Sequence, residues 1–246
     1  TVTKQVLENI SFVDSLSITY LGSNFKLVGA DADYFKLETG PLGGVNLVFR
    51  DAPDFEAPAG GHNNYSFTVE YKNLFGQSKS DTYKVQVNDV NEAPTGMSST
   101  TFKVDENTTA RTKVAHVDVV DPDTNPAFHA YDFALLTLDN RFEVDSKGDV
   151  YLKANKVLDY ESGPICITVV AADKQFPLYL AATTITLDVN DVDEAPTALK
   201  LSNVLKSIDE NDDAGKTIAK LSVVDPDTNP EFRSYDYKVM KMVGGA

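Results

Sequence analysis

The sequence predicts an all-β protein made of tandem seven-stranded Greek-key β-sandwiches. Two observations support this prediction: an internal repeat of about 100 residues, and short apolar segments with the alternation typical of β-strands. A repeat of this length has the size of one small domain and is too long for a solenoid unit. No segment shows a sustained period of about 3.6 residues, so we do not expect helices in the core.

The repeat is clearest in one acidic segment. Fifteen residues starting at Val119 and fifteen starting at Val223 share eleven identical positions, including Asp-Pro-Asp-Thr-Asn, at an offset of 104 residues. The Asp-Glu-Asn segment at 105–107 recurs at 209–211 with the same offset. Both segments therefore belong to one repeating unit.

A second acidic segment marks the joins between units. The residues at 89–95 read DVNEAPT, and those at 191–197 read DVDEAPT, 102 residues further on. A weaker copy of the unit opens the chain at Leu7-Glu8-Asn9. The expected domains are a divergent one at 1–92, a second one at 93–194, and the N-terminal half of a third, truncated one at 195–246.

Strand signals fill the repeat. Residues 112–119 alternate between apolar and polar, and 165–172 and 183–189 are rich in β-branched and apolar residues. Residues 145–149 have the composition of a hairpin turn between two further short strands. About seven such strands in a unit of about 100 residues indicate a Greek-key sandwich.

Composition excludes several functional classes. The chain has 22 Lys and Arg against 37 Asp and Glu, a formal charge of −15, which disfavours binding to nucleic acid or to anionic membranes. A single Cys excludes an internal disulfide framework and a cysteine-based zinc site. No apolar run reaches the roughly 20 residues of a membrane span. The chain has no Gly-x-Ser-x-Gly, no His-Glu-x-x-His, no phosphate-binding loop and no dinucleotide-binding motif. The acidic residues recur in each repeat, whereas an active site usually occurs once, so we do not expect an enzyme.

Acidic residues gather where the repeats should join. Loops at one end of a two-layer sandwich cluster, so the carboxylates of one domain would face loops of the next. Six or more like charges within a Debye length of about 8–10 Å repel strongly unless a cation bridges them. Ca2+ accepts 6–8 oxygen ligands in flexible geometry, whereas Mg2+ prefers to keep its waters. The alternative is that these are ordinary turn residues, but the recurrence of the whole set favours Ca2+.

An EF-hand loop is a further alternative for part of this set. The segment from Asp121 to Asp132 has acidic residues at suitable positions. However, Pro126 stands where that loop requires a glycine for its sharp turn. We therefore do not expect an EF-hand.

Taken in order, the residues of the second repeat resemble a cadherin repeat. The motifs are Glu106-Asn107, Arg141-Phe142 through Gly148, Leu158-Asp159-Tyr160-Glu161, Val170-Ala171-Ala172-Asp173 and Asp191-Val192-Asp193-Glu194-Ala195-Pro196. The linker is more similar to microbial cadherin-like surface proteins than to animal cadherins, which usually carry one more Asn before the Pro. The resemblance implies a seven-stranded sandwich with Ca2+ ions between successive repeats.

The resemblance also implies two sets of calcium ligands. The first set would be Glu8, Asp54, Glu56, Asp89, Asn91, Glu92, Asp121, Asp123, Asn125 and Asp173. The second set would be Glu106, Asp159, Glu161, Asp191, Asp193, Glu194, Asp225, Asp227 and Asn229. No catalytic or other cofactor-binding residue is implied.

The first repeat departs from the pattern at its own beginning. Where the acidic pair should lie, the chain reads Ser23-Asn24-Phe25, and the counterpart of Asp173 is Asn73. This repeat therefore lacks half of a calcium site, and we expect it to be a terminal or specialised domain.

The expected function is a calcium-binding, calcium-rigidified extracellular adhesin or cell-surface stalk that mediates cell adhesion. Its expected partners are calcium ions and a protein or glycan on another cell or surface, with self-association as a further option. The chain has no Trp, so the Trp-anchored strand exchange of some animal cadherins cannot operate. Two alternatives remain: a structural subunit of an extracellular filament or surface layer, and a carbohydrate-binding surface module.

Overall fold

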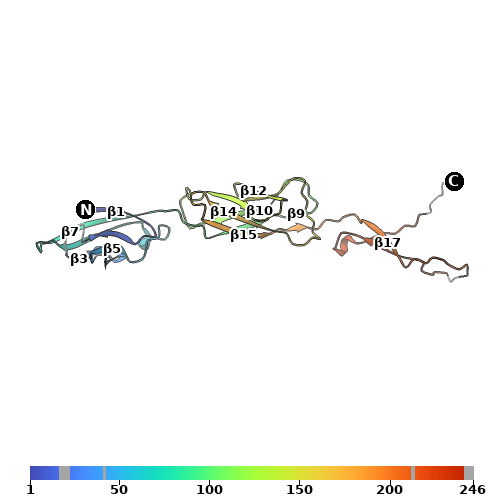
Figure 1. Ribbon diagram of the computed structural model, residues 1–246, viewed down its shortest axis with the longest axis horizontal. Coiled ribbons are helices and arrows are strands. Elements are labelled where there is room, and N and C mark those ends of the chain that lie inside the picture. The colour runs from blue at the N-terminus through green and yellow to red at the C-terminus, as the bar shows by residue number, and fades with distance from the viewer. Residues whose placement is uncertain (17–22, 41–42, 212–213, 241–246) are drawn as a thin grey trace. The chain divides into compact units, whose positions relative to one another are not determined.

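The structure is a computed structural model that describes residues 1–16, 23–40, 43–211 and 214–240 (Figure 1). Strands dominate these ranges, and short 3-10 turns lie at Ala32–Tyr34, Ala59–Gly61 and Pro230–Phe232. The chain divides into two compact units: Thr1–Pro94 with Asp121–Ala130, and Thr95–Val120 with Tyr131–Ala246. The domain boundaries expected from the repeat differ from this division and stay a prediction.

The first unit contains two facing sheets. One sheet has the order β1 (Val2–Leu7), β7 (Ser78–Asn88), β6 (Asn64–Lys72), β3 (Ser23–Val28). The other has the order β2 (Phe12–Ser15), β5 (Val45–Phe49), β4 (Phe35–Thr39). Strand β1 runs parallel to β7, in a register that joins Val2 to Tyr83 and Leu7 to Asn88. The long β6–β7 hairpin is antiparallel.

Alternation along the strands builds the core of the first unit. On β6, Tyr65, Phe67 and Val69 are buried, whereas the residues between them face outward. The ring of Phe35 lies 4.4 Å from that of Phe49 and 4.3 Å from that of Phe67, centroid to centroid. The first contact lies within one sheet, between β4 and β5, and the second joins the two sheets, so the centre of this core is largely aromatic.

The second unit repeats the two-sheet arrangement. One sheet has the order β12 (Phe142–Val144), β13 (Asp149–Leu152), β10 (Thr112–Val120), β8 (Gly96–Thr101). The other has the order β11 (Tyr131–Leu135), β14 (Cys166–Asp173), β15 (Leu180–Thr186), and the short strands β16 (Val189–Asn190) and β9 (Val104–Asp105) pair in parallel. Its buried core is mainly aliphatic.

The hairpin turn expected at 145–149 requires a glycine. Gly148 has a φ of 80°, and a Cβ there would lie 2.5 Å from the carbonyl oxygen of Val117. Both the backbone conformation and the close approach therefore exclude other residues. The turn joins β12 to β13, as the sequence predicted.

The remaining described residues form a hairpin without a core of its own. Strands β17 (Ala198–Ser202) and β18 (Lys220–Val224) pair antiparallel. Leu199 and Leu201 on β17 are 59% and 62% exposed. The expectation of a truncated third domain stays a prediction.

The predicted fold class is confirmed: the chain is all-β and contains β-sandwich domains. The segments predicted as strands at 112–119, 165–172 and 183–189 lie in or overlap β10, β14 and β15. Within the described ranges, no helix has both the length and the apolar character needed to span a membrane.

Candidate metal centres

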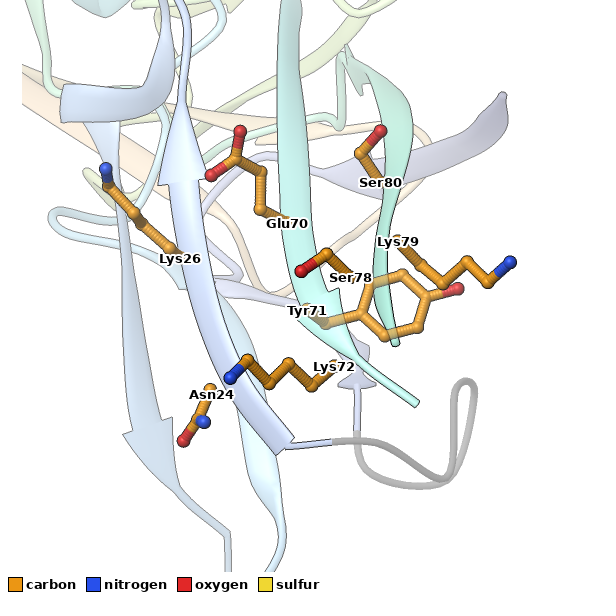
Figure 2. A pocket seen from close by; sticks show the side chains of 8 residues that line it. All are labelled: Asn24, Lys26, Glu70, Tyr71, Lys72, Ser78, Lys79 and Ser80. Atoms are coloured by element: carbon orange, nitrogen blue, oxygen red, sulfur yellow. The ribbon is translucent and has the colours of Figure 1, made fainter. Parts of the chain in front are cut away.

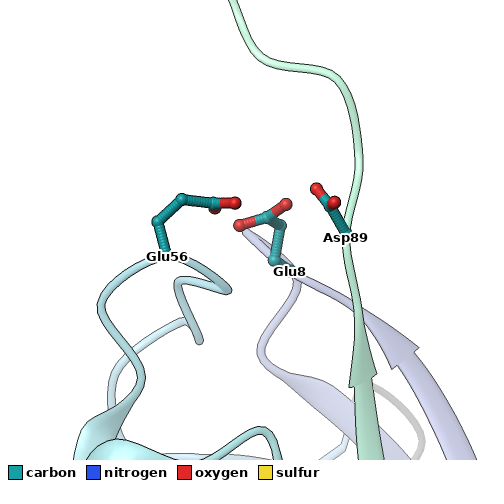
Figure 3. Close-up of side chains that lie close together, drawn as sticks. All are labelled: Glu8, Glu56 and Asp89. Atoms are coloured by element: carbon teal, nitrogen blue, oxygen red, sulfur yellow. The ribbon is translucent and has the colours of Figure 1, made fainter. Parts of the chain in front are cut away.

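A buried glutamate organises the end of the first unit. Glu8 follows β1 and is only 1% exposed. One of its carboxylate oxygens accepts a hydrogen bond from the backbone N–H of Phe55 and the other from that of Val90, both at 2.8 Å. Figure 3 shows the carboxylates of Glu56 and Asp89 turned toward Glu8, and one oxygen of each of the three lies within 4.8 Å of the others. Glu8 thus ties a loop and the chain after β7 to one point.

A second group of carboxylates adjoins the first through Glu56. Oxygens of Glu56, Glu92 and Asp123 also lie within 4.8 Å of one another. The backbone N–H of Glu92 donates to Asp123 Oδ2 at 3.0 Å, and the N–H and hydroxyl of Thr124 both donate to Glu56 Oε1 at 3.2 Å. We call Glu8, Glu56, Asp89, Glu92 and Asp123 the first cluster.

The second unit contains an equivalent set. Glu106, 3% exposed, accepts hydrogen bonds from the backbone N–H groups of Tyr160 at 2.8 Å and Val192 at 2.9 Å. Its carboxylate lies within 4.8 Å of oxygens of Glu161 and Asp191. The arrangement of the first cluster is thus reproduced 98–105 residues further along the chain.

The outer part of the second set also matches the first. The backbone N–H of Glu194 donates to Asp227 Oδ2 at 3.0 Å. The N–H of Thr228 donates to Glu161 Oε1 at 3.3 Å and its hydroxyl to the same atom at 3.4 Å. We call Glu106, Glu161, Asp191, Glu194 and Asp227 the second cluster.

Several carboxyl groups of the clusters have raised pKa values, so their ionised forms are disfavoured. The pKa of Asp123 is raised to about 6, mainly by burial and also by the nearby charges of Asp121 and Asp89, while a backbone hydrogen bond from Glu92 opposes the rise. Burial also raises the pKa of Glu8, Asp191 and Asp227, each with help from neighbouring acids. Removal from water and like charge both disfavour ionised carboxylates. A bound cation would relieve both effects.

Several oxygens in the clusters have no hydrogen-bond donor. Among the described residues, the buried atoms Glu56 Oε2, Asp89 Oδ1 and Asp123 Oδ1 of the first cluster lack a partner, as do Glu161 Oε2, Asp191 Oδ1 and Asp227 Oδ1 of the second. Buried polar atoms almost always have a hydrogen-bond partner, so these oxygens are suited to bind a further ligand. Hard carboxylate oxygens are the ligands that Ca2+ prefers, so the residues fit this ion.

The comparison with protein families agrees with this geometry. Residues 100–190 match the family model described as the cadherin domain. The resemblance to the cadherin repeat family that the sequence indicated is therefore confirmed. Cadherin domains generally bind Ca2+, and cadherins are adhesion proteins rather than enzymes.

Similar cadherins span much longer chains. Protocadherin gamma-B7 of Pan troglodytes is 33% identical over 95 residues, which cover 37% of this chain and 10% of that protein. Cadherin-20 of Xenopus laevis is 27% identical over 220 residues, covering 86% of this chain and 28% of its own. The solved structure of protocadherin gamma B7 extracellular cadherin domains 1–4 has a TM-score of 0.64 and 17% identity, over 93% of this chain and 58% of that one. The microbial character expected of the linker stays a prediction.

Other residues predicted as ligands take part in turns. Asp54 Oδ1 accepts from the N–H of Ala57 at 2.8 Å, and Asp159 accepts from both the N–H and the hydroxyl of Ser162. Asp173 is 1% exposed and accepts from the turn that follows β14. The cation-sized groups found within the described ranges do not include these three aspartates.

The remaining predicted ligands lie in the linkers and the acidic loops. Asp121 and Asp225 each accept from the backbone N–H two residues ahead at 3.0 Å, and Asn125 and Asn229 do so at 3.1 Å. In the linkers, Asn91 is buried, whereas Asp193 is exposed. Their assignment as ligands stays a prediction.

Two asparagines that the sequence analysis did not predict as site residues hydrogen-bond to the two clusters. Asn9 and Asn107 have left-handed backbones, with φ of 61° and 57°, which Asn tolerates better than most residues. The amide Nδ2 of Asn9 donates to Glu92 Oε1 and that of Asn107 to Glu194 Oε1, both at 2.7 Å. The signal was available, because Asn follows the motif Glu in all three copies.

Proposed function

We propose that this chain is a calcium-binding, extracellular adhesion segment in which Ca2+ at each acidic cluster stiffens the join between successive repeats. The observation that supports it is the set of buried carboxylate oxygens without hydrogen-bond donors in both clusters. Two clusters with the same partners, about 100 residues apart, are a recurrent structural device rather than a single active site. We propose no catalytic role.

Within each cluster, some residues would bind the ion directly and others would add negative charge beside it. In the first, Glu56, Asp89 and Asp123 would hold the ion through their unpartnered oxygens. Glu8 would contribute negative charge while its two backbone hydrogen bonds fix the position of the carboxylate. When bound, Ca2+ supplies positive charge that cancels the repulsion between these groups.

The consequence for the linker follows from the chain path. The loop at 121–130 lies with the first unit, yet it is covalently continuous with β10 and β11 of the second. Fixing Asp123 to the first cluster would therefore restrict how the linker at 89–95 bends. Without the ion, burial and, to a lesser extent, the charges of Asp121 and Asp89 raise the pKa of Asp123 and so disfavour its ionised form.

The adhesive role and the location rest on the relatives. The solved neighbours include protocadherin extracellular domains and a cis-dimer of protocadherin gamma B7. We propose that this chain lies outside the cell and contacts a protein or glycan on another surface. A filament subunit is the second candidate, favoured by the exposed leucines of β17; ordered polymers seen by electron microscopy at micromolar protein would support it.

The test is a thermal melt in chelator, followed by titration with Ca2+ and with Mg2+. We expect a large rise in melting temperature with sub-millimolar Ca2+ and little with Mg2+. Glu106→Ala should reduce the rise in the transition of the second unit. The matched control is Asp132→Asn, because the Asp132 side chain is 76% exposed and lies outside the clusters.

Two results would count against the proposal. If Ca2+ leaves the melting curve unchanged, the acidic loops are ordinary solvated turns and no stiffening by calcium occurs. If Glu106→Ala and Asp132→Asn reduce the Ca2+ response equally, the response reflects the general negative charge of the chain and not the clusters.

A further inference from the structure

The end of the first unit opposite its acidic cluster, which we call its distal pole, carries the β6–β7 turn. The linker leaves from the end of β7, whereas the β6–β7 hairpin turns at 73–77, one strand length away. The strand order β3-β6-β7 of this sheet matches the order β11-β14-β15 of the second unit. The hairpin turn of the first unit therefore corresponds to the turn after β14.

Charge is reversed between these two equivalent ends. In the second unit, β14 ends at Asp173, which is buried and pairs in register with Tyr131. In the first unit, β6 ends at Lys72, which pairs with Ser23 and is followed by Asn73. The first unit thus has lysine and amide groups where the second has a buried carboxylate.

An open groove of about 740 Å³ lies at this pole (Figure 2). It is lined by Asn24, Lys26, Glu70, Tyr71, Lys72, Ser78, Lys79 and Ser80. Three lysines against one glutamate give the lining a formal charge of +2, in a chain whose total is −15. Figure 2 shows the amine of Lys72 extending toward Asn24.

The lysines of this groove are available for a ligand. Lys26, Lys72 and Lys79 are exposed, and among the described residues none of them forms an ion pair. Glu70 lies opposite Lys26 in the strand register, but it does not approach that amine within ion-pair distance. Within the described residues, no acid therefore forms an ion pair with these three lysines.

The hairpin turn beside the groove is closed by side-chain hydrogen bonds and carries an exposed aromatic ring. Asn73 Oδ1 accepts hydrogen bonds from the backbone N–H groups of Phe75 and Gln77, both at 3.0 Å. Its Nδ2 donates to Gln77 Oε1 at 3.0 Å. This turn holds Phe75 at 87% exposure and Leu74 at 75%. The backbone of the turn is thus held by three hydrogen bonds beside an exposed aromatic ring.

We propose that this groove binds an anionic polysaccharide, a sugar chain that carries carboxylate or sulfate groups. Lys26 and Lys72 would form charge-assisted hydrogen bonds with the acidic groups. The hydroxyls of Ser78 and Ser80 and the amide of Asn24 match sugar hydroxyls, which both donate and accept. The polar lining disfavours an apolar ligand, and the charge of −15 disfavours adsorption of polyanions elsewhere on the chain.

The test measures binding of the full chain, with Ca2+ present, to three immobilised sugar chains at about 0.15 M salt. Heparin carries sulfate, polygalacturonate carries carboxylate only, and dextran is neutral. We expect binding to heparin, to polygalacturonate or to both, and none to dextran. Preference between the two acidic chains identifies which group the lysines recognise.

The variant Lys26→Gln/Lys72→Gln should weaken this binding by about tenfold or more, since two charge-assisted hydrogen bonds are lost. The matched control is Lys200→Gln/Lys206→Gln, which changes the charge equally at two exposed lysines of the other unit and should change affinity less than about twofold. Because all four lysines are exposed, we expect both variants to keep the melting curves of the wild type in chelator and in Ca2+. Such curves would show that both variants fold.

Three outcomes would overturn the proposal. The first is that neither acidic sugar chain binds. The second is that the two double variants weaken binding equally, which would indicate diffuse charge and no site. The third is that sedimentation shows the groove variant abolishing self-association while no sugar chain binds, which would assign the groove to an acidic surface of a second copy. None of these outcomes depends on Ca2+ binding, so the calcium proposal is tested separately.

Discussion

Replacing Asp123 with Asn should stabilise the protein without Ca2+ and destabilise it with Ca2+. Asp123 is 2% exposed, and its Oδ2 accepts one backbone hydrogen bond from Glu92 while Oδ1 has no partner among the described residues. An asparagine keeps an oxygen for that hydrogen bond and removes the charge. The variant therefore separates the cost of an uncompensated anion from its value as a calcium ligand.

The size of the effect follows from the raised pKa of Asp123. Its value rises from 3.8 to about 6, and at about 1.4 kcal/mol per unit this destabilises the metal-free fold by up to about 3 kcal/mol at pH 7. The folded protein binds the proton of Asp123 more tightly than the unfolded chain does. The stability that protonated Asp123 contributes is therefore fully present below pH 3.8 and is lost as the pH rises through 6. At about 4 °C per kcal/mol, the variant should melt about 10 °C higher at pH 7.

The assay is a set of melts of wild type and Asp123→Asn, at pH 4 and pH 7, in chelator and in Ca2+. In chelator the advantage of the variant should be large at pH 7 and nearly absent at pH 4, where Asp123 is protonated in the folded wild type. In Ca2+ at pH 7 the order should reverse. A variant that is less stable than wild type in chelator at pH 7 would refute the reasoning, because it would show that the charge of Asp123 is already compensated.

Three further substitutions test other parts of the structure. Glu106→Gln should cost about 1–3 kcal/mol in urea melts even in chelator, because its carboxylate accepts two backbone hydrogen bonds that a Gln amide cannot both replace. Asn107→Ala should lower the free energy of unfolding by about 1–2 kcal/mol, because it loses the hydrogen bond to Glu194 and places alanine in a left-handed backbone. Asn107→Gly loses the same hydrogen bond but tolerates that backbone, so it should recover only the backbone part of the loss. If Asn107→Gly is as stable as the wild type, the hydrogen bond contributes nothing. Tyr83→Phe should cost about 1–2 kcal/mol in the same melts, because its buried hydroxyl donates to Asp14 Oδ2 at 2.7 Å; an unchanged midpoint would contradict this.

The repeat made the broad plan of the fold and the clusters predictable. Glu106 and Asp191 could be chosen because the same residue types recur at nearly constant offsets, and copies of one unit must place them alike. The structure brings both into one cluster. The recurrence cannot tell a carboxylate that faces an ion from one that caps a turn. Asp54 and Asp159 recur equally well, yet their oxygens accept hydrogen bonds within their own loops.

The positive groove could not be predicted from the sequence. Lys26 and Lys72 are 46 residues apart, and they line one groove only because β3 pairs with β6 in a particular register. A shift of one residue in that register would turn one of the two to the opposite face of the sheet. The sequence did show the absence of acidic residues at Ser23-Asn24-Phe25, but an absence alone does not indicate what replaces them.

The parallel pairing of β1 with β7 governs how the first unit responds to tension. A pull on the chain from both sides acts along these two adjacent strands in opposite directions, so it shears them past each other. All six residue pairs from Val2–Tyr83 to Leu7–Asn88 then resist together, whereas an antiparallel hairpin would open one pair at a time. The equivalent pairing of β16 with β9 has only two residue pairs. Under equal load we expect the second unit to yield first, which single-molecule pulling can measure.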